Sequence, residues 1–383
     1  MGEKNTLLLC QELEKGRKIE EINDIPQTVF LRRKDRIPGG IKDDDIVLHS
    51  FEECVRNKKA HAENFKHIEE ESNRIHAQRI IQPVGNLFAV QNPMFPPLKT
   101  EELDAAYDLP YTRLPHPKYK GKTIPAYEMI KFSINMHRGC FGGCAFCTIS
   151  AHQGKFVVCR SKESILNEAR QITQMPDFKG YISDLGGPSA NMYGMHGRNL
   201  NVCEHCKRPS CINPAICPNL ITDHAKLLDI YHAVDALPGV KKSFIGSGVR
   251  YDLILHKSKD EQSNANAVTY ARELISKHVS GRLKVAPENT SDRVLKFMRK
   301  PSFKLFYDKI NKEEGLKQQI IPYFISSHPG CEEEDMAELA VLTKKLDFHL
   351  EQVQDFTPTP MTVSTTAFYT GYDPYSLEPV FCA

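Results

Sequence analysis

The stretch His137-Arg-Gly-Cys140-Phe-Gly-Gly-Cys144-Ala-Phe-Cys147 carries three cysteines at the spacing C-x3-C-x2-C. Clustered thiols in a reducing compartment are metal ligands rather than disulfide partners. Three thiolates can hold three irons of a [4Fe–4S] cluster and leave the fourth iron open to another ligand. The glycines of the stretch allow a tight loop and bring backbone amides near the cluster. Zinc is the alternative metal, because C-x2-C to C-x4-C spacings also suit tetrahedral thiolate sites.

Around this loop, short apolar runs alternate with amphipathic stretches. Strands are predicted at 129–136, 180–185, 242–246, 282–286, 319–326 and 351–356, and helices at 161–173, 222–236, 265–279, 291–299 and 332–348. This alternation predicts an α/β fold with a parallel sheet. Right-handed crossovers would curl the six units into a partial (β/α)6 TIM-like barrel or lay them out as a doubly wound sheet. In both folds the site lies at the carboxyl ends of the strands, where the cysteine loop begins.

The chain before the first of these strands has a different character. Apolar runs at 28–31 and 45–49 predict short strands, and a capping box of Ser50 and Glu53 predicts a polar helix that runs to about residue 81. Residues 83–125 are rich in proline, which predicts a connector. The predicted divisions are an N-terminal helical and extended segment (1–82), the connector (83–125), the barrel (126–360) with an insertion (191–219), and a C-terminal tail (361–383).

The composition bounds the kinds of partner. The 50 Lys and Arg residues nearly balance 48 Asp and Glu residues, so no net charge would attract a polyanion, and nucleic acid is not implied. The first apolar run, 7–10, is too short for a signal peptide, and no stretch approaches the ~20 apolar residues of a membrane span. We therefore expect a soluble cytoplasmic protein with no membrane contact.

The triplet, with an aromatic residue directly before its last cysteine, closely resembles the radical S-adenosylmethionine superfamily. Further segments are similar to the YgiQ-type group of these enzymes: DLGGPSANMY (184–193), GSGVRYD (246–252), APENTSD (286–292), PYFISSHPG (322–330) and QDFTPTP (354–360). The resemblance covers roughly residues 80–375. Members of that group have a longer N-terminal domain, so residues 1–80 resemble its trailing part and the chain resembles a truncated form.

The resemblance implies an enzyme in which Cys140, Cys144 and Cys147 hold a 4Fe-4S cluster. S-adenosyl-L-methionine would chelate the open iron, and an electron from an external flavodoxin-like or ferredoxin-like donor would cleave it to a 5'-deoxyadenosyl radical. The radical would then act on a substrate that the residues do not disclose. The second-strand Gly-Gly-Glu motif of the superfamily is replaced here by Gly186-Gly187-Pro188, so only the two glycines are expected to meet the cosubstrate. A plain strand-end turn is the alternative for them.

Other polar residues follow the later strands. Ser247, Arg250 and Glu288 would face the ribose hydroxyls or the methionyl carboxylate if the barrel forms, and are equally well explained as ion-pair or capping residues. Three more candidates, His328, Cys331 and Asp355, lie at or after the last two strands, where a substrate would be reached. An ordinary strand-to-helix turn is the alternative for His328-Pro-Gly.

The insertion carries a second cysteine group, Cys203-x2-Cys206-x4-Cys211-x5-Cys217. Four thiols in fifteen residues with few apolar neighbours indicate a segment that a metal orders. Structural zinc and an auxiliary iron-sulfur cluster both remain open, and free surface thiols are the third interpretation. The alternative to an enzyme is a non-catalytic zinc or iron-sulfur binding protein that contacts nucleic acid or transfers electrons.

Overall fold

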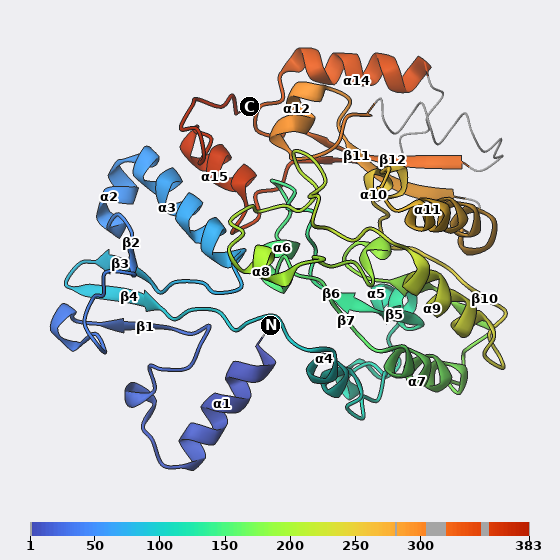
Figure 1. The fold of residues 1–383 in the computed structure, drawn as a ribbon, viewed down its shortest axis with the longest axis horizontal. Coiled ribbons are helices and arrows are strands. Elements are labelled where there is room, and N and C mark those ends of the chain that lie inside the picture. The colour runs from blue at the N-terminus through green and yellow to red at the C-terminus, as the bar shows by residue number, and fades with distance from the viewer. Residues whose placement is uncertain (1, 280–281, 304–318, 346–351, 383) are drawn as a thin grey trace.

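The computed structural model describes residues 2–279, 282–303, 319–345 and 352–382 (Figure 1). Within these ranges the chain is a mixed α/β protein, as the sequence predicted. An N-terminal sheet with its helices lies on one side, and parallel strands with their helices make up the other (Figure 1). None of the described helices is both long enough and apolar enough to span a membrane.

The N-terminal sheet has four strands in the order β1-β4-β3-β2. Its strands are β1 (Val29–Arg32), β2 (Ile46–Val47), β3 (Ile80–Val84) and β4 (Leu87–Gln91). Pairs β1–β4 and β3–β4 are antiparallel, and β2–β3 is parallel. Ile37, Ile81 and Val90 form the small buried core beneath it. The helices of the first part of the chain are α1 (Glu3–Glu14), α2 (Phe51–Arg56), α3 (Lys58–Ser72), α4 (Thr100–Tyr107) and α5 (Pro125–Ile130).

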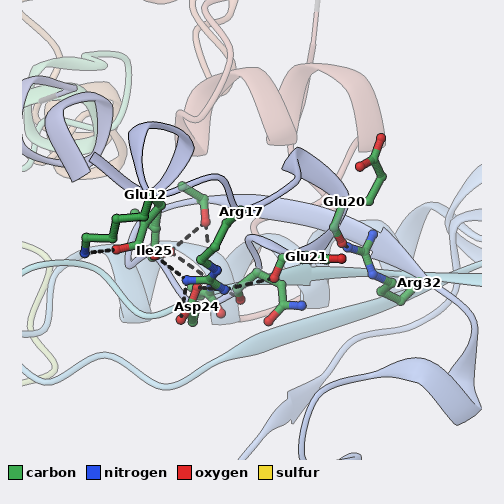
Figure 2. Close-up of polar contacts among 11 residues, drawn as sticks. Glu12, Arg17, Glu20, Glu21, Asp24, Ile25 and Arg32 are labelled. Atoms are coloured by element: carbon green, nitrogen blue, oxygen red, sulfur yellow. Dashed lines mark hydrogen bonds and ion pairs between the residues drawn. The ribbon is translucent and has the colours of Figure 1, made fainter. Parts of the chain in front are cut away.

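An ion-pair network fixes the turn between α1 and β1, as Figure 2 shows. Arg17 Nη1 donates to Glu12 Oε2 at 2.7 Å, and Arg17 Nη2 donates to Asp24 Oδ1 at 3.2 Å. Arg32 on β1 donates to the backbone carbonyl of Glu20. Exposed pairs of this kind contribute about 0–1 kcal/mol each, so their role is to orient the segment rather than to hold it folded.

The single helix predicted from Ser50 to about residue 81 was wrong. The Ser50 cap is confirmed, since its side chain accepts from the Glu53 N–H at 3.1 Å. The helix then breaks at Asn57, whose side chain accepts from the N–H of Lys59 and starts α3 as a second helix. Residues 80–84 pair with β4 as a strand instead, because Ile80 and Ile81 are buried against that partner.

The predicted boundary at 82/83 therefore falls inside strand β3. Pro83 sits opposite Phe88 in a hairpin that turns at Gly85, so the connector begins after β4. The connector also contains the helix α4, and α5 begins at its last residue, Pro125. Pro125 stands at the first position of α5, where its missing N–H costs nothing, and this helix takes residues 129 and 130 out of the predicted first strand.

Parallel strands dominate the rest of the chain. They are β5 (Ser133–Asn135), β8 (Tyr181–Ile182), β9 (Asp184–Gly186), β10 (Lys242–Ser243), β11 (Arg282–Glu288), β12 (Gln319–Ser326) and β13 (Gln352–Asp355). The parallel ladders are β5–β9, β8–β10 and β11–β12–β13, and the Leu185 N–H donates to the Phe244 carbonyl at 2.8 Å between the first two. Five of the six predicted strand regions each overlap one of these strands, and the region 180–185 overlaps both β8 and β9. Residue 351 of the last prediction lies outside the described residues.

These ladders do not close into a barrel within the described part of the chain. A short antiparallel pair, β6 (His137–Arg138) and β7 (Val158–Cys159), precedes and follows the cysteine loop. The helices of this part are α6 (Ile149–Gln153), α7 (Lys162–Thr173), α8 (Leu200–Glu204), α9 (Ala225–Asp235), α10 (Tyr251–Leu255), α11 (Glu261–Glu273), α12 (Asp292–Phe297), α14 (Glu333–Lys345) and α15 (Val363–Thr370). The shorter helical turns are η1 (Ile19–Glu21), η2 (Lys34–Arg36), η3 (Pro117–Tyr119), η4 (Ala190–Met192) and η5 (Leu274–His278).

The predicted C-terminal tail includes a helix that joins the two parts of the molecule. Figure 1 shows α15 beside α3, although they lie at opposite ends of the sequence. Lys58 Nζ donates to the Tyr369 carbonyl at 2.8 Å. Phe65 of α3 and Val363 of α15 share a buried cluster with Ala145 of the cysteine loop. The N-terminal segment therefore packs directly behind the predicted metal site.

Candidate metal centre

The cysteine loop follows β6 and is pinned by its neighbours. The Cys140 N–H donates to the Gly154 carbonyl at 3.0 Å. Gly139 has a φ of +88°, and a Cβ at that position would lie 2.4 Å from the Phe156 carbonyl oxygen. Both the positive φ and the close Phe156 carbonyl require glycine at position 139, so this residue sets the path of the loop.

The thiols of the triplet lie close enough to influence one another. Burial raises the pKa of Cys140 to about 11 and that of Cys147 to about 12, and the nearby Cys144 thiol acts in the same direction on both. The Gly142 N–H donates to Cys140 Sγ at 3.4 Å. A Cβ on Gly142 would lie 3.2 Å from Cys140 Sγ and 3.8 Å from Cys144 Sγ. Thiols in such surroundings ionise only when a bound cation stabilises the thiolates.

This donor set fits an iron-sulfur cluster. Thiolates are soft ligands that favour iron-sulfur clusters and zinc, and amide hydrogen bonds to sulfur are typical of cluster sites. Among the residues that the structure describes, no three or more His, Cys, Asp or Glu side chains form a group that could hold a single metal ion. The residues that would hold the cluster are Cys140, Cys144 and Cys147.

Arg250 lies against this cysteine loop. Its Nη1 donates to Cys144 Sγ at 3.3 Å, while Nε and Nη2 donate to the two carboxylate oxygens of Asp252 at 2.9 and 2.5 Å. Burial works against ionisation of Asp252, but the guanidinium outweighs it and holds the pKa of that carboxyl below its usual value. The structure thus places Arg250 beside a cluster ligand, and only Nη1 is free of Asp252.

A second buried ion pair lies near the triplet and near Arg250. Glu288 Oε1 is 3.7 Å from Lys300 Nζ, and both residues are buried. Glu288 ends strand β11 at a bulge with φ +72°, in the left-handed region that a non-glycine residue rarely adopts. Burial raises the pKa of Glu288, and its charge acts on Cys147. The structure therefore brings Glu288 to the cysteine loop, in a strained conformation.

Ser247 and Gly186 meet at the ends of adjacent strands through Asp184. The Asp184 carboxylate accepts from the Gly246 and Ser247 N–H groups at 2.9 and 3.1 Å and from the Ser247 hydroxyl. A Cβ on Gly186 would lie 2.6 Å from Ser247 Oγ. Protein neighbours alone thus require glycine at 186, and the Ser247 hydroxyl is already engaged as a donor.

Gly187 packs against His137, the residue that begins the cysteine stretch. A Cβ at 187 would lie 2.4 Å from His137 Cε1. The imidazole is fully buried, neither ring nitrogen has a hydrogen-bond partner among the described residues, and burial lowers the pKa of His137 to about 4. A neutral imidazole with two unsatisfied nitrogens thus lies beneath the glycines predicted to meet the cosubstrate.

Comparison with known proteins bears on this site. The family model "Radical SAM N-terminal" matches residues 1–133. Two curated proteins named UPF0313 protein are similar to this chain. The one from Bacteroides thetaiotaomicron is 69% identical over 94% of this chain and 58% of the relative. The one from Porphyromonas gingivalis is 58% identical over 100% of this chain and 61% of the relative. The chain is therefore similar to the radical S-adenosylmethionine superfamily. The predicted resemblance is confirmed at that level.

The chain spans about three fifths of the length of these curated relatives. A further UPF0313 protein, from Methanocella arvoryzae, is 46% identical over all of this chain and 62% of the relative. Among solved structures, the cobalamin-dependent S-adenosylmethionine radical enzyme OxsB with aqua-cobalamin bound aligns at 14% identity and a TM-score of 0.42, over 60% of this chain and 28% of that one.

This site also includes residues that were not singled out from the sequence. They are His137, Asp184, Asp252 and Lys300. The first three lie inside or directly beside stretches that were singled out, so adjacency to those stretches was the available signal. Lys300 carried no such signal, because only the tertiary fold brings it to Glu288.

The remaining predicted candidates make contacts that a structural role would explain. His328 is buried, its Nε2 contacts Ser364 Oγ at 2.7 Å and its ring packs edge-on against Phe146 of the cysteine loop. Cys331 is buried beside Asn289, and Asp355 accepts from the Ser326 hydroxyl. His328 therefore links the C-terminal helix to the cysteine loop. The strand-to-helix turn that was the alternative interpretation of His328-Pro-Gly is also present.

The cysteine loop is also supported from behind by the N-terminal segment. Glu69 of α3 accepts from Arg299 Nη1 and Nη2 at 2.7 and 3.1 Å and from the Tyr375 hydroxyl at 2.5 Å. Arg299 Nη1 also donates to the Gly143 carbonyl at 3.4 Å. A carboxylate far away in the sequence thus orients the arginine that contacts the loop.

We expect Glu69→Gln to lower the free energy of unfolding by about 1–3 kcal/mol, because an amide replaces the charge in a half-buried network. Iron retained after anaerobic reconstitution should fall with it, since Arg299 loses its anchor. The neighbouring Glu70→Gln is the matched control, because no side-chain hydrogen bond or ion pair of Glu70 is found among the described residues. Urea unfolding and iron content test both variants, and equal behaviour of the two would contradict the expected role.

Proposed function

We propose that this protein is a radical S-adenosylmethionine enzyme that reductively cleaves its cosubstrate to start chemistry on a separate substrate. The observation that carries the proposal is the set of three partly buried thiols, two of which lie within the influence of the Arg250 cation, in a protein similar to this superfamily. When bound, a [4Fe–4S] cluster supplies one electron to the sulfonium, so that a carbon–sulfur bond breaks into methionine and a 5'-deoxyadenosyl radical.

The protein's own residues have distinct tasks in this proposal. Cys140, Cys144 and Cys147 hold the cluster, and the Arg250 and Lys300 cations offset its negative charge. The parallel ladders form a partial (β/α)6 barrel whose strand ends shield the radical from water. The cosubstrate lies over Gly186 and Gly187 near Ser247 and Glu288. Electrons come from an external flavodoxin-like or ferredoxin-like donor.

The test is to reconstitute the chain anaerobically with iron and sulfide, add dithionite and S-adenosylmethionine, and measure 5'-deoxyadenosine. We expect a brown protein that forms 5'-deoxyadenosine, and a Cys147→Ala variant that does not. The longer relative from Bacteroides thetaiotaomicron is the positive control, since this chain spans only part of it. A colourless protein that binds zinc alone would support the non-catalytic alternative. Iron-loaded protein that leaves the cosubstrate intact in both chains would refute the proposal.

A further inference from the structure

The four cysteines of the insertion are gathered into one region. The Cys206 N–H donates to the Cys203 carbonyl at 3.1 Å, and the Cys217 N–H donates to the Cys211 carbonyl at 2.7 Å. Burial raises the pKa of Cys211 to about 11, and the other three thiols of the set act on it as nearby charges. Cys203, Cys211 and Cys217 also border a cavity of about 980 Å³ beside the connector.

A buried lysine lies at the same place. Lys155 is 1% exposed, and its Nζ lies 3.9 Å from Cys206 Sγ and donates to the Arg208 carbonyl at 2.7 Å. No carboxylate of the described residues forms an ion pair with it. Removing an ammonium from water without a counter-charge is costly, and the groups found to stabilise it here are the neutral Arg208 carbonyl and the Phe156 ring, whose centroid lies 4.9 Å from Nζ. Four metal-bound thiolates would supply the missing negative charge.

The insertion also touches the catalytic cysteine loop. The Cys211 N–H donates to the Phe141 carbonyl at 3.0 Å, so one hydrogen bond and a short run of covalent bonds separate Cys211 from Cys140. The Ser210 hydroxyl donates to the Gly142 carbonyl at 2.8 Å. Phe141 and Ile212 pack in one buried cluster, against which Cys140 and Cys211 also lie. A metal on the insertion would therefore be adjacent to the first metal site.

We propose that Cys203, Cys206, Cys211 and Cys217 hold a second iron-sulfur cluster, charge-balanced by Lys155 and in electronic contact with the first. Zinc sites are closed tetrahedra usually built from two short knuckles, but Cys211 and Cys217 are separated by five residues. A cluster spreads its ligands more widely than a single zinc ion does, and three of these cysteines border the same cavity. The terminal Cys217-Pro218 pair also matches the ending of bacterial ferredoxin ligand runs.

The test compares iron content and spectra in three anaerobically reconstituted forms of the 383-residue chain. They are the wild type, a variant with Cys140, Cys144 and Cys147 all replaced by alanine, and a variant with Cys206→Ala and Cys211→Ala. We expect about eight irons in the first and about four in each variant, with brown colour in all three. In the reduced wild type, electron paramagnetic resonance should show spin coupling between the clusters that each variant lacks.

The reduction potential of the second cluster distinguishes an electrostatic role of Lys155 from a purely structural one. Lys155→Met should make the reduction potential of the second cluster more negative, because a nearby positive charge no longer favours the added electron. Lys155→Arg keeps the charge and should restore the wild-type potential. Both are measured in the background that lacks Cys140, Cys144 and Cys147, where only the second cluster remains.

Several results would overturn this inference. One is zinc found in the insertion after iron loading, and another is a protein without iron when only the insertion cysteines remain. The third is about four irons in the wild type, with the same iron content in the variant that carries Cys206→Ala and Cys211→Ala. These outcomes do not depend on S-adenosylmethionine cleavage, so failure here is distinguishable from failure of the proposed function.

Discussion

Arg250→Met is expected to destabilise the folded chain by about 3–5 kcal/mol, because it leaves the Asp252 carboxylate buried without its partner. Asp252 has only 8% of its side chain exposed, so water cannot replace the two hydrogen bonds that the guanidinium donates. The loss should be smaller at pH 5 than at pH 7.5. Without the guanidinium, burial raises the pKa of Asp252, and the neutral acid that forms at lower pH is cheaper to bury.

A double variant separates the ion pair from simple packing. Arg250→Met combined with Asp252→Leu removes both charges, and its stability should lie within about 1–2 kcal/mol of wild type. Urea unfolding at both pH values measures these differences. Equal destabilisation of the single and double variants would mean that Arg250 acts through its contact with Cys144 or through shape, and not through the buried charge.

Gly187→Ala is expected to cost about 3 kcal/mol or more, even with no cosubstrate present. The added Cβ would lie 2.4 Å from one ring atom of His137 and within 2.9 Å of two others. The imidazole cannot move away easily, because it is fully buried. The resemblance assigns this glycine to cosubstrate binding, whereas the structure predicts a defect in folding itself.

Gly248→Ala is the matched control for this prediction. A Cβ at 248 meets nothing within 4 Å, so the change should stay within about 0.5 kcal/mol. Combining Gly187→Ala with His137→Ala should recover stability beyond the sum of the two single effects, because the ring that clashes is gone. If Gly187→Ala unfolds at the wild-type urea concentration and loses only affinity for S-adenosylmethionine, the steric argument is wrong.

The sequence could predict the features that depend on local chemistry. Three thiols and three glycines in a few residues indicate a metal loop wherever they occur, and runs such as 319–326 favour strands through their own residues. The sequence could not predict that Ile80 and Ile81 belong to a strand, because their burial depends on the hairpin partner β4. Helix propensity favoured continuation there, and tertiary pairing overrode it.

At the site, the sequence by itself singled out the residues that we propose to carry the chemistry: Cys140, Cys144 and Cys147, and the four cysteines of the insertion. Only the tertiary structure decided what surrounds them, namely Arg250 with Asp252 beside one group and Lys155 beside the other. The reason is physical. Ligand type and spacing are local properties of the chain, whereas compensation of a buried charge depends on groups that folding brings together from distant segments.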